Sequence, residues 1–184
     1  MSIRSEKLTV SVVIPEGVKI TLNKRMLNVT GPLGMAYKSF RKIPVNIDVS
    51  DDKVVLNSVS GRKKDYAILN TSRSIVDKLC RGVITGYTIK MKIVFAHFPI
   101  TVKTKDDFVL IENFQGERAM RTSRIMGNVK VTPKGDDVII TGYILTDVTQ
   151  TAANIAQATK VKNKDHRVFL DGIYRFEKID SIES

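Results

Sequence analysis

The sequence predicts an α+β fold built from two tandem, similar small domains, each a mostly antiparallel sheet packed against helices. Three observations predict it. At 184 residues the chain is long enough for two small domains with their own cores. Each half passes from strand hairpins to an amphipathic helix. A long alternating strand, residues 87–95, follows the first helix and opens the second half. We therefore expect a first domain at residues 1–84 and a second at residues 85–184.

Strand hairpins are predicted in both halves from alternating apolar residues around turn-forming residues. Pairs of aspartates, or Gly with Asp, mark three of the hairpin tips, and Asn23-Lys24-Arg25 marks the fourth. The predicted hairpins span residues 20–30, 47–59, 100–111 and 129–141.

A helix is predicted in each half from apolar residues at helical spacing. The first runs over residues 64–81, with Gly82 as its expected C-terminal stop. The second runs over residues 149–160, with Asp147 or Thr149 as candidate N-cap. The stripe of the first helix consists of Ile68, Ser72, Ile75 and Leu79, and it is widened by Leu69, Val76 and Cys80.

The net charge of the chain indicates which kinds of binding partner to expect. Thirty Lys and Arg against nineteen Asp and Glu give a formal net charge of +11, which favours an acidic partner such as nucleic acid or an anionic membrane surface. No run of about 18 apolar residues is present, so we expect no membrane span, and the first ten residues do not resemble a signal peptide. The lone Cys80 excludes an internal disulfide and favours a reducing compartment such as the cytosol.

Catalytic chemistry has little support. A rival hypothesis, a small hydrolase or transferase, needs Cys80 as nucleophile and His97 as base, but Cys80 falls on the apolar stripe of a predicted helix. One cysteine and two histidines provide no zinc spacing. The paired aspartates lie at predicted hairpin tips, where Asp favours turns. We expect no enzyme activity, no metal and no cofactor.

Two basic clusters are the candidate nucleic-acid contacts, since Lys and Arg neutralise phosphates. The first follows the second helix, where His166 adds a further hydrogen-bonding group, and the other spaces its arginines by three. The first consists of Lys160, Lys162, Asn163, Lys164 and Arg167, and the second of Arg118, Arg121 and Arg124.

Several glycines are predicted at structural turns. Gly31-Pro32-Leu33-Gly34 has the spacing of the backbone-clamping loop of KH domains, but it lies between strand-like segments, which favours a plain turn. Further turns are predicted at Gly116 and at Asp171-Gly172.

The C-terminal part of the chain carries a specific motif, in which Gln157, Val161, Lys164 and Arg167 precede or lead into residues 169–174 (FLDGIY). Further characteristic stretches are residues 29–34, 95–100, 113–117 and 161–165. By these motifs the chain resembles one known family, the universal large-subunit ribosomal protein counted as the sixth in bacteria and the ninth in eukaryotes, in its eukaryotic and archaeal form, and the C-terminal motif, which stands at the spacing of the family's signature, is the most specific match.

This resemblance implies two tandem α/β domains and no enzymatic activity. It also implies binding of large-subunit rRNA, chiefly through the second domain, near the sarcin–ricin loop and the region where translation GTPases dock. The implied partners are that rRNA and neighbouring large-subunit proteins in the cytoplasmic ribosome, with no small-molecule substrate and no membrane. A free RNA chaperone or extraribosomal regulator using the same surface stays open as an alternative.

Overall fold

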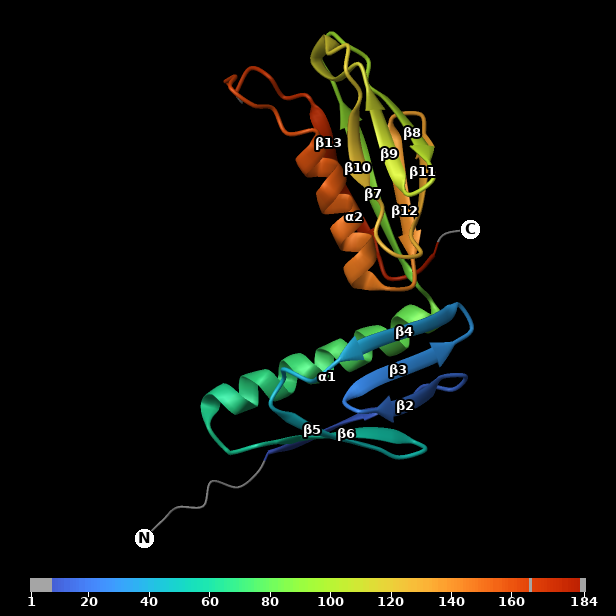
Figure 1. The fold of residues 1–184 in the computed structure, drawn as a ribbon, viewed down its shortest axis with the longest axis vertical. Helices are drawn as coiled ribbons and strands as arrows, with labels where there is room; N and C mark the ends of the chain where they lie inside the picture. The colour runs from blue at the N-terminus through green and yellow to red at the C-terminus, as the bar shows by residue number, and fades with distance from the viewer. Residues whose placement is uncertain (1–7, 166, 183–184) are drawn as a thin grey trace. The chain divides into compact units, whose positions relative to one another are not determined.

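The computed structural model describes residues 8–165 and 167–182, so His166 lies outside the described residues. The chain divides between Ile84 and Thr85 into two compact units, called unit 1 and unit 2 below (Figure 1). Each unit contains antiparallel sheets and a helix, so the predicted α+β class with repeated small domains is confirmed.

Unit 1 contains two three-stranded antiparallel sheets, and its helix α1 (Lys63–Ile84) packs against both. One sheet has the strand order β1-β6-β5 and the other β2-β3-β4. The strands are β1 (Thr9–Val13), β2 (Lys19–Asn23), β3 (Met26–Gly31), β4 (Gly34–Ser39), β5 (Val45–Val49) and β6 (Lys53–Ser58).

Unit 2 repeats this plan with helix α2 (Leu145–Ala158) and adds a short 3-10 turn at Phe114–Gly116. Its sheets have the orders β10-β9-β8 and β11-β12-β7-β13. The strands are β7 (Tyr87–Val94), β8 (Thr101–Lys105), β9 (Phe108–Glu112), β10 (Arg121–Arg124), β11 (Lys130–Lys134), β12 (Asp137–Gly142) and β13 (Gly172–Ile179).

The two units share the same strand topology. The order β1-β6-β5 corresponds to β7-β12-β11, and β2-β3-β4 corresponds to β8-β9-β10, with a helix following in each unit. Unit 2 differs by β13, which pairs antiparallel with β7 along the edge that β1 leaves unpaired in unit 1. β7 therefore becomes an interior strand, and its residues Tyr87, Ile89 and Met91 are fully buried.

Both helix boundaries differ from the sequence prediction. The prediction that α1 stops at Gly82 is wrong, because the helix continues to Ile84 and Gly82 is buried within it. The glycine that follows the true end is Gly86, whose φ of +70° is the left-handed conformation typical of helix ends. The extra turn buries Val83 against the sheet.

Helix α2 begins four residues before the predicted start. Its N-cap position is Ile144, which has no side chain able to cap, so neither Asp147 nor Thr149 is the cap. The Thr149 hydroxyl instead donates to the Leu145 carbonyl inside the helix at 2.8 Å. Burial of Val148, Ala152 and Ile155 fixes this helix on its sheets, each large apolar side chain contributing about 1.5–3 kcal/mol.

Candidate nucleic-acid interface

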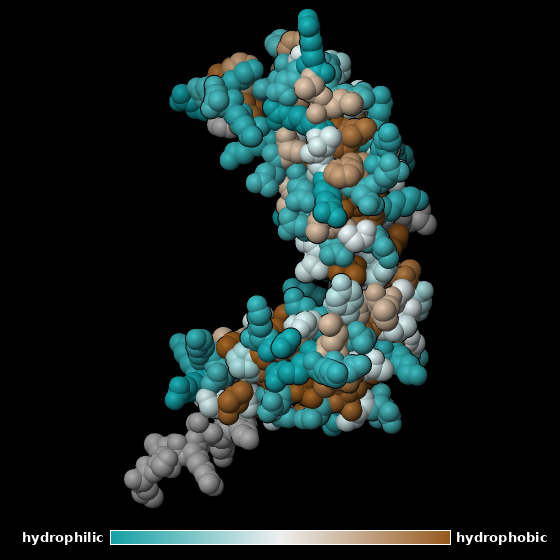
Figure 2. Space-filling model, viewed as in Figure 1, coloured by the Kyte–Doolittle hydropathy of each residue, from teal (hydrophilic) through white to brown (hydrophobic). Residues whose placement is uncertain are grey.

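The first predicted cluster lies in one segment of unit 2, residues 160–170 between α2 and β13, which we call the basic loop. It projects from the unit as the orange-red loop of Figure 1. Its predicted contact residues Lys160, Lys162, Asn163, Lys164 and Arg167 are all exposed. In Figure 2 hydrophilic and hydrophobic side chains lie next to each other on this segment.

The shape of the basic loop is set by its own hydrogen bonds. The Asp165 carbonyl accepts from the backbone N–H of Val168 at 3.1 Å and of Phe169 at 3.0 Å. The Asp165 carboxylate accepts from the Arg167 backbone at 2.9 Å and from its guanidinium. Asn163 takes a left-handed φ of +58°, which Asn tolerates better than most residues. Asp165 therefore organises the loop, a role that the charge pattern alone did not indicate.

The loop is also fixed at both ends. At its start, the buried Thr159 hydroxyl accepts from the Ile173 backbone N–H at 3.1 Å. At its end, the buried Asp171 carboxylate accepts from the Ala96 backbone N–H at 3.1 Å. These bonds join the loop ends to β13 and to the segment after β7. The backbone that carries the cations is therefore held in position at both ends of the loop.

The cations of the basic loop differ in how available they are. Within residues 8–165 and 167–182, Lys160 and Lys162 form no ion pair. The Lys164 ammonium lies 4.8 Å from the centre of the Phe169 ring. Arg167 pairs with Asp165, but its side chain is 90% exposed, so this pair contributes little and exchanges easily for a phosphate.

The second predicted cluster does not form one surface. Arg121 and Arg124 are three residues apart on β10, and because strand side chains alternate, they lie on opposite faces. Arg124 is exposed, whereas Arg121 is partly buried. Arg118 precedes the strand in an exposed loop.

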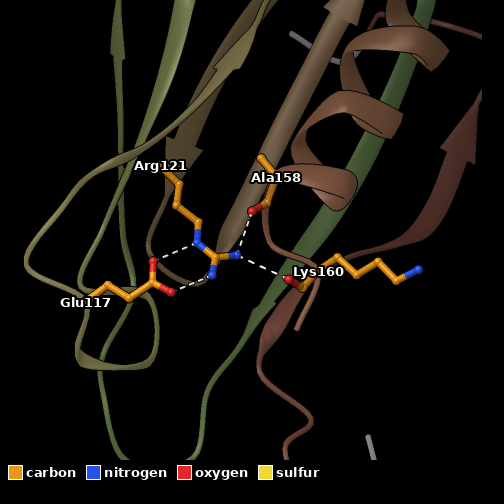
Figure 3. Close-up of polar contacts among 4 residues, drawn as sticks. All are labelled: Glu117, Arg121, Ala158 and Lys160. Carbon is orange, nitrogen blue, oxygen red and sulfur yellow. Dashed lines mark hydrogen bonds and ion pairs between the residues drawn. The ribbon is translucent and has the colours of Figure 1, made fainter. Parts of the chain in front are cut away.

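Arg121 is engaged in the fold, as Figure 3 shows. Its Nε and Nη2 donate to the two Glu117 carboxylate oxygens at 2.8 and 2.5 Å. Its Nη1 donates to the Ala158 carbonyl at 2.9 Å and the Lys160 carbonyl at 3.2 Å, at the C-terminal end of α2. The guanidinium also lies 4.0 Å from the centre of the Phe114 ring. Arg121 is therefore a clamp at the start of the basic loop, and the prediction that it binds phosphate does not fit its contacts.

Glu117 links this clamp to the basic loop electrostatically. The hydrogen bond from Arg121 is the main cause that lowers the pKa of Glu117, and the charges of Arg121, Lys164 and Lys162 add to it. Lys162 and Lys164 therefore lie close enough to act on the segment between β9 and β10. Since Arg121 donates to both Glu117 oxygens, the negative charge of this carboxylate is offset mainly by Arg121 and less by the lysines of the loop.

The predicted turn residues have varied surroundings. Gly31 and Gly34 face each other across a two-residue turn between β3 and β4. A Cβ on Gly31 would lie 2.7 Å from Val83 Cγ2, and the Leu33 N–H donates to the Val83 carbonyl at 3.0 Å. The turn therefore packs closely on the end of α1. A KH-type loop would instead join two helices.

Three further residues were predicted at turns in the second domain. Gly116 has a φ of +75°, and a Cβ there would lie 3.1 Å from the Phe98 ring. The prediction of a turn at Asp171-Gly172 is wrong, because Gly172 is the first residue of β13 and pairs with Val94. Gly172 has a different reason to lack a side chain, since the Tyr174 ring lies 2.8 Å from where its Cβ would be. The ring covers the glycine on the same face of the strand.

The surroundings of Cys80 and the placement of potential metal ligands, both within the part of the chain that the structure describes, bear on the rival enzyme hypothesis. Burial, with a smaller effect of Asp77, raises the pKa of Cys80 to about 11, which disfavours the thiolate that a Cys80–His97 enzyme would need. No group of three potential metal ligands occurs among the described residues. In the same part of the chain, neither helix is long and apolar enough to span a membrane.

Comparison with known proteins gives one consistent family. The family model described as Ribosomal protein L6 matches residues 14–86 and 98–172. The large ribosomal subunit protein uL6 of Methanobrevibacter smithii is 46% identical over 165 residues, covering 90% of this chain and 93% of the relative. That of Methanosphaera stadtmanae is 42% identical over 172 residues, covering 93% and 94%. That of Aeropyrum pernix is 41% identical over 166 residues, covering 90% and 91%. With matches in both halves and over about nine-tenths of its length, the chain belongs to the ribosomal protein L6 family.

Proposed function

We propose that unit 2 docks this chain onto large-subunit rRNA through the basic loop. The family is one of structural, non-enzymatic ribosomal proteins, and the relatives carry the name large ribosomal subunit protein. In this proposal the chain is a constituent of the large subunit and contacts neighbouring ribosomal proteins there. Its site lies near the sarcin–ricin loop and the docking region of translation GTPases, as the resemblance of its C-terminal signature implies.

The observation that carries the proposal is the exposed group of cations on a hydrogen-bonded loop. Lys160, Lys162, Lys164 and Arg167 neutralise phosphates, and Asn163 donates a hydrogen bond to a phosphate or ribose oxygen. The loop ends are fixed by Thr159 and Asp171, so less conformational entropy is lost on binding than for a disordered tail. Arg118 and Arg124 add attraction from nearby, because both are exposed.

The experiment is a salt titration of binding between the full chain and a transcript of large-subunit rRNA. Each neutralised phosphate contributes about 0.7–0.9 to the slope of log affinity against log salt. A variant with Lys160, Lys162, Lys164 and Arg167 changed to Ala loses roughly 3 from this slope if each cation meets a phosphate.

The matched control removes the same number of exposed cations outside the loop. It changes Lys19, Lys105, Lys130 and Lys134 to Ala, all of which are exposed. The control variant keeps most of the wild-type slope. Equal losses in the two variants would mean that the chain binds RNA only through its overall charge, and the proposal would fail.

A further inference from the structure

Two phenylalanines are exposed in unit 2, one within the basic loop and one in a segment that is hydrogen-bonded to the end of that loop. Phe98 is 48% exposed in the segment between β7 and β8, and Phe169 is 39% exposed in the basic loop. A phenylalanine has no polar group that benefits from water, so exposed rings grouped with cations indicate a ligand surface.

The structure joins the segments that carry the two rings. Ala96 N–H donates to the Asp171 carboxylate, which ties the Phe98 segment to the end of the basic loop. Asn113 Nδ2 donates to the Pro99 carbonyl at 3.0 Å, which ties the same segment to the end of β9. The Phe98 ring lies under Gly116, whose φ of +75° and missing Cβ leave room for it. Both rings therefore stand on anchored backbone.

Positive charge lies over the Phe169 ring, and a further exposed cation follows closely in sequence the glycine that packs on Phe98. The Lys164 ammonium lies over the Phe169 ring at 4.8 Å from its centre. Arg118 is exposed two residues after Gly116, which packs on Phe98, and Lys162 and Lys164 act electrostatically on Glu117 in between. Glu117 itself is held by Arg121 and does not repel a polyanion strongly. A ring with a cation beside it matches the two parts of an unpaired nucleotide, the base and its phosphate.

We propose that Phe98 and Phe169 are stacking platforms for unpaired rRNA bases, while Lys162, Lys164 and Arg118 hold the adjacent phosphates. This inference rests on the proposed function and adds the kind of RNA element that the site prefers. A paired helix keeps its bases stacked inside and cannot offer them to these rings, so the surface selects a loop or bulge. The positive charge around the rings favours RNA over an apolar protein partner.

The test uses the full chain and an oligouridylate with one central 2-aminopurine, whose fluorescence falls when the base stacks on an aromatic ring. A fully paired RNA hairpin is the second probe. The wild type quenches the single-stranded probe, and each Ala substitution at Phe98 or Phe169 lowers its affinity roughly tenfold. Affinity for the hairpin stays near wild type, and the salt slope on both probes is unchanged because no phosphate contact is lost.

Phe108 provides the matched control, since it is 46% exposed on β9 of the same unit. Phe108→Ala leaves binding of both probes unchanged. Phe98→Leu and Phe169→Leu keep apolar packing but remove the ring, so they guard against a folding defect and are expected to bind as weakly as the Ala variants.

Three outcomes overturn the stacking proposal. The first is that both the Ala and the Leu variants at Phe98 and Phe169 bind the single-stranded probe with wild-type affinity. Another is wild-type affinity of Phe98→Leu or Phe169→Leu for the single-stranded probe while the Ala variant at the same position binds weakly, since this indicates apolar contact rather than stacking. The third is that the Phe98 and Phe169 variants lose their association with the large subunit but keep their affinity for both RNA probes. That result would assign the rings to a protein partner. The proposed function itself is tested separately by Lys162→Ala with Lys164→Ala, which lowers the salt slope whether or not the rings stack.

Discussion

Arg121 and Lys162 lie in similarly basic stretches of the sequence, but the structure gives their side chains different surroundings. Arg121 donates to the two Glu117 oxygens and to two carbonyls at the end of α2. Lys162 is exposed, and within the described residues it forms no ion pair. Composition could not separate them, because the partners of Arg121 include backbone carbonyls nearly 40 residues further along the chain.

We expect Arg121→Met to destabilise unit 2 by about 2–4 kcal/mol, because Glu117 and the two carbonyls lose a charged donor. The midpoint and slope of urea unfolding, followed by circular dichroism, measure this loss. Arg124→Met is the control on the same strand, since Arg124 is exposed, and it leaves the midpoint unchanged. If Arg121→Met unfolded at the wild-type midpoint, the hydrogen bonds of Arg121 would not stabilise unit 2.

Because the pKa of Glu117 is lowered in the folded chain, we expect the stability of the fold to depend on pH. The pKa of Glu117 is lowered mainly by the hydrogen bond from Arg121. Its stabilisation is therefore complete above the unfolded pKa near 4.5 and is lost as the pH falls through the lower folded pKa. Because the side chain is 40% exposed, we expect Glu117→Gln to cost only about 0.5–1 kcal/mol at pH 7.

Unfolding of wild type and Glu117→Gln from neutral to acid pH checks this expectation. The difference between the two proteins should shrink as the pH falls below 4.5. A difference that is constant over the whole range would show that the ionised carboxylate contributes nothing.

At the scale of elements, the hairpins, the helices and strand β7 were predictable, because apolar residues recur at the period of each structure. The helix ends were not. Gly82 and Gly86 are both plausible stops, and only the burial of Val83 shows why the helix reaches Ile84. The start of α2 was missed because Ile144 offers no capping side chain. Strand β13 was not predicted, because Gly172 was interpreted as a turn residue, whereas in the structure it begins the strand and Tyr174 covers it.

The contact between the β3–β4 turn and α1 yields a prediction at this scale. Gly31→Ala places a Cβ 2.7 Å from Val83 Cγ2 and 2.9 Å from the Val83 carbonyl, so turn and helix must separate. We expect a loss of about 1–3 kcal/mol in unfolding free energy. Thr30→Ala, at the exposed neighbouring position, is the control. Equal unfolding midpoints for the two variants would show that the close approach has no energetic importance.

The whole molecule is a repeat whose copies differ where the function is proposed. In unit 1, α1 ends at Ile84 and the chain enters β7 at Tyr87. In unit 2, the basic loop and the additional strand β13 follow α2. The repeat and the basic segment were readable from the sequence. The loop anchors were not, because Asp171, Thr159 and Asp165 act through backbone contacts that no periodicity reveals.

Sedimentation of the chain with ribosomes shows whether the basic loop anchors this protein to the large subunit. Tagged wild type, the Lys160/Lys162/Lys164/Arg167→Ala variant and the control with four other cations removed are expressed in cells and separated on sucrose gradients. We expect wild type and control to travel with large subunits and whole ribosomes, and the loop variant to shift to the free fractions. Wild-type co-sedimentation of the loop variant would contradict it, and wild type found mainly in the free fractions would favour an extraribosomal role.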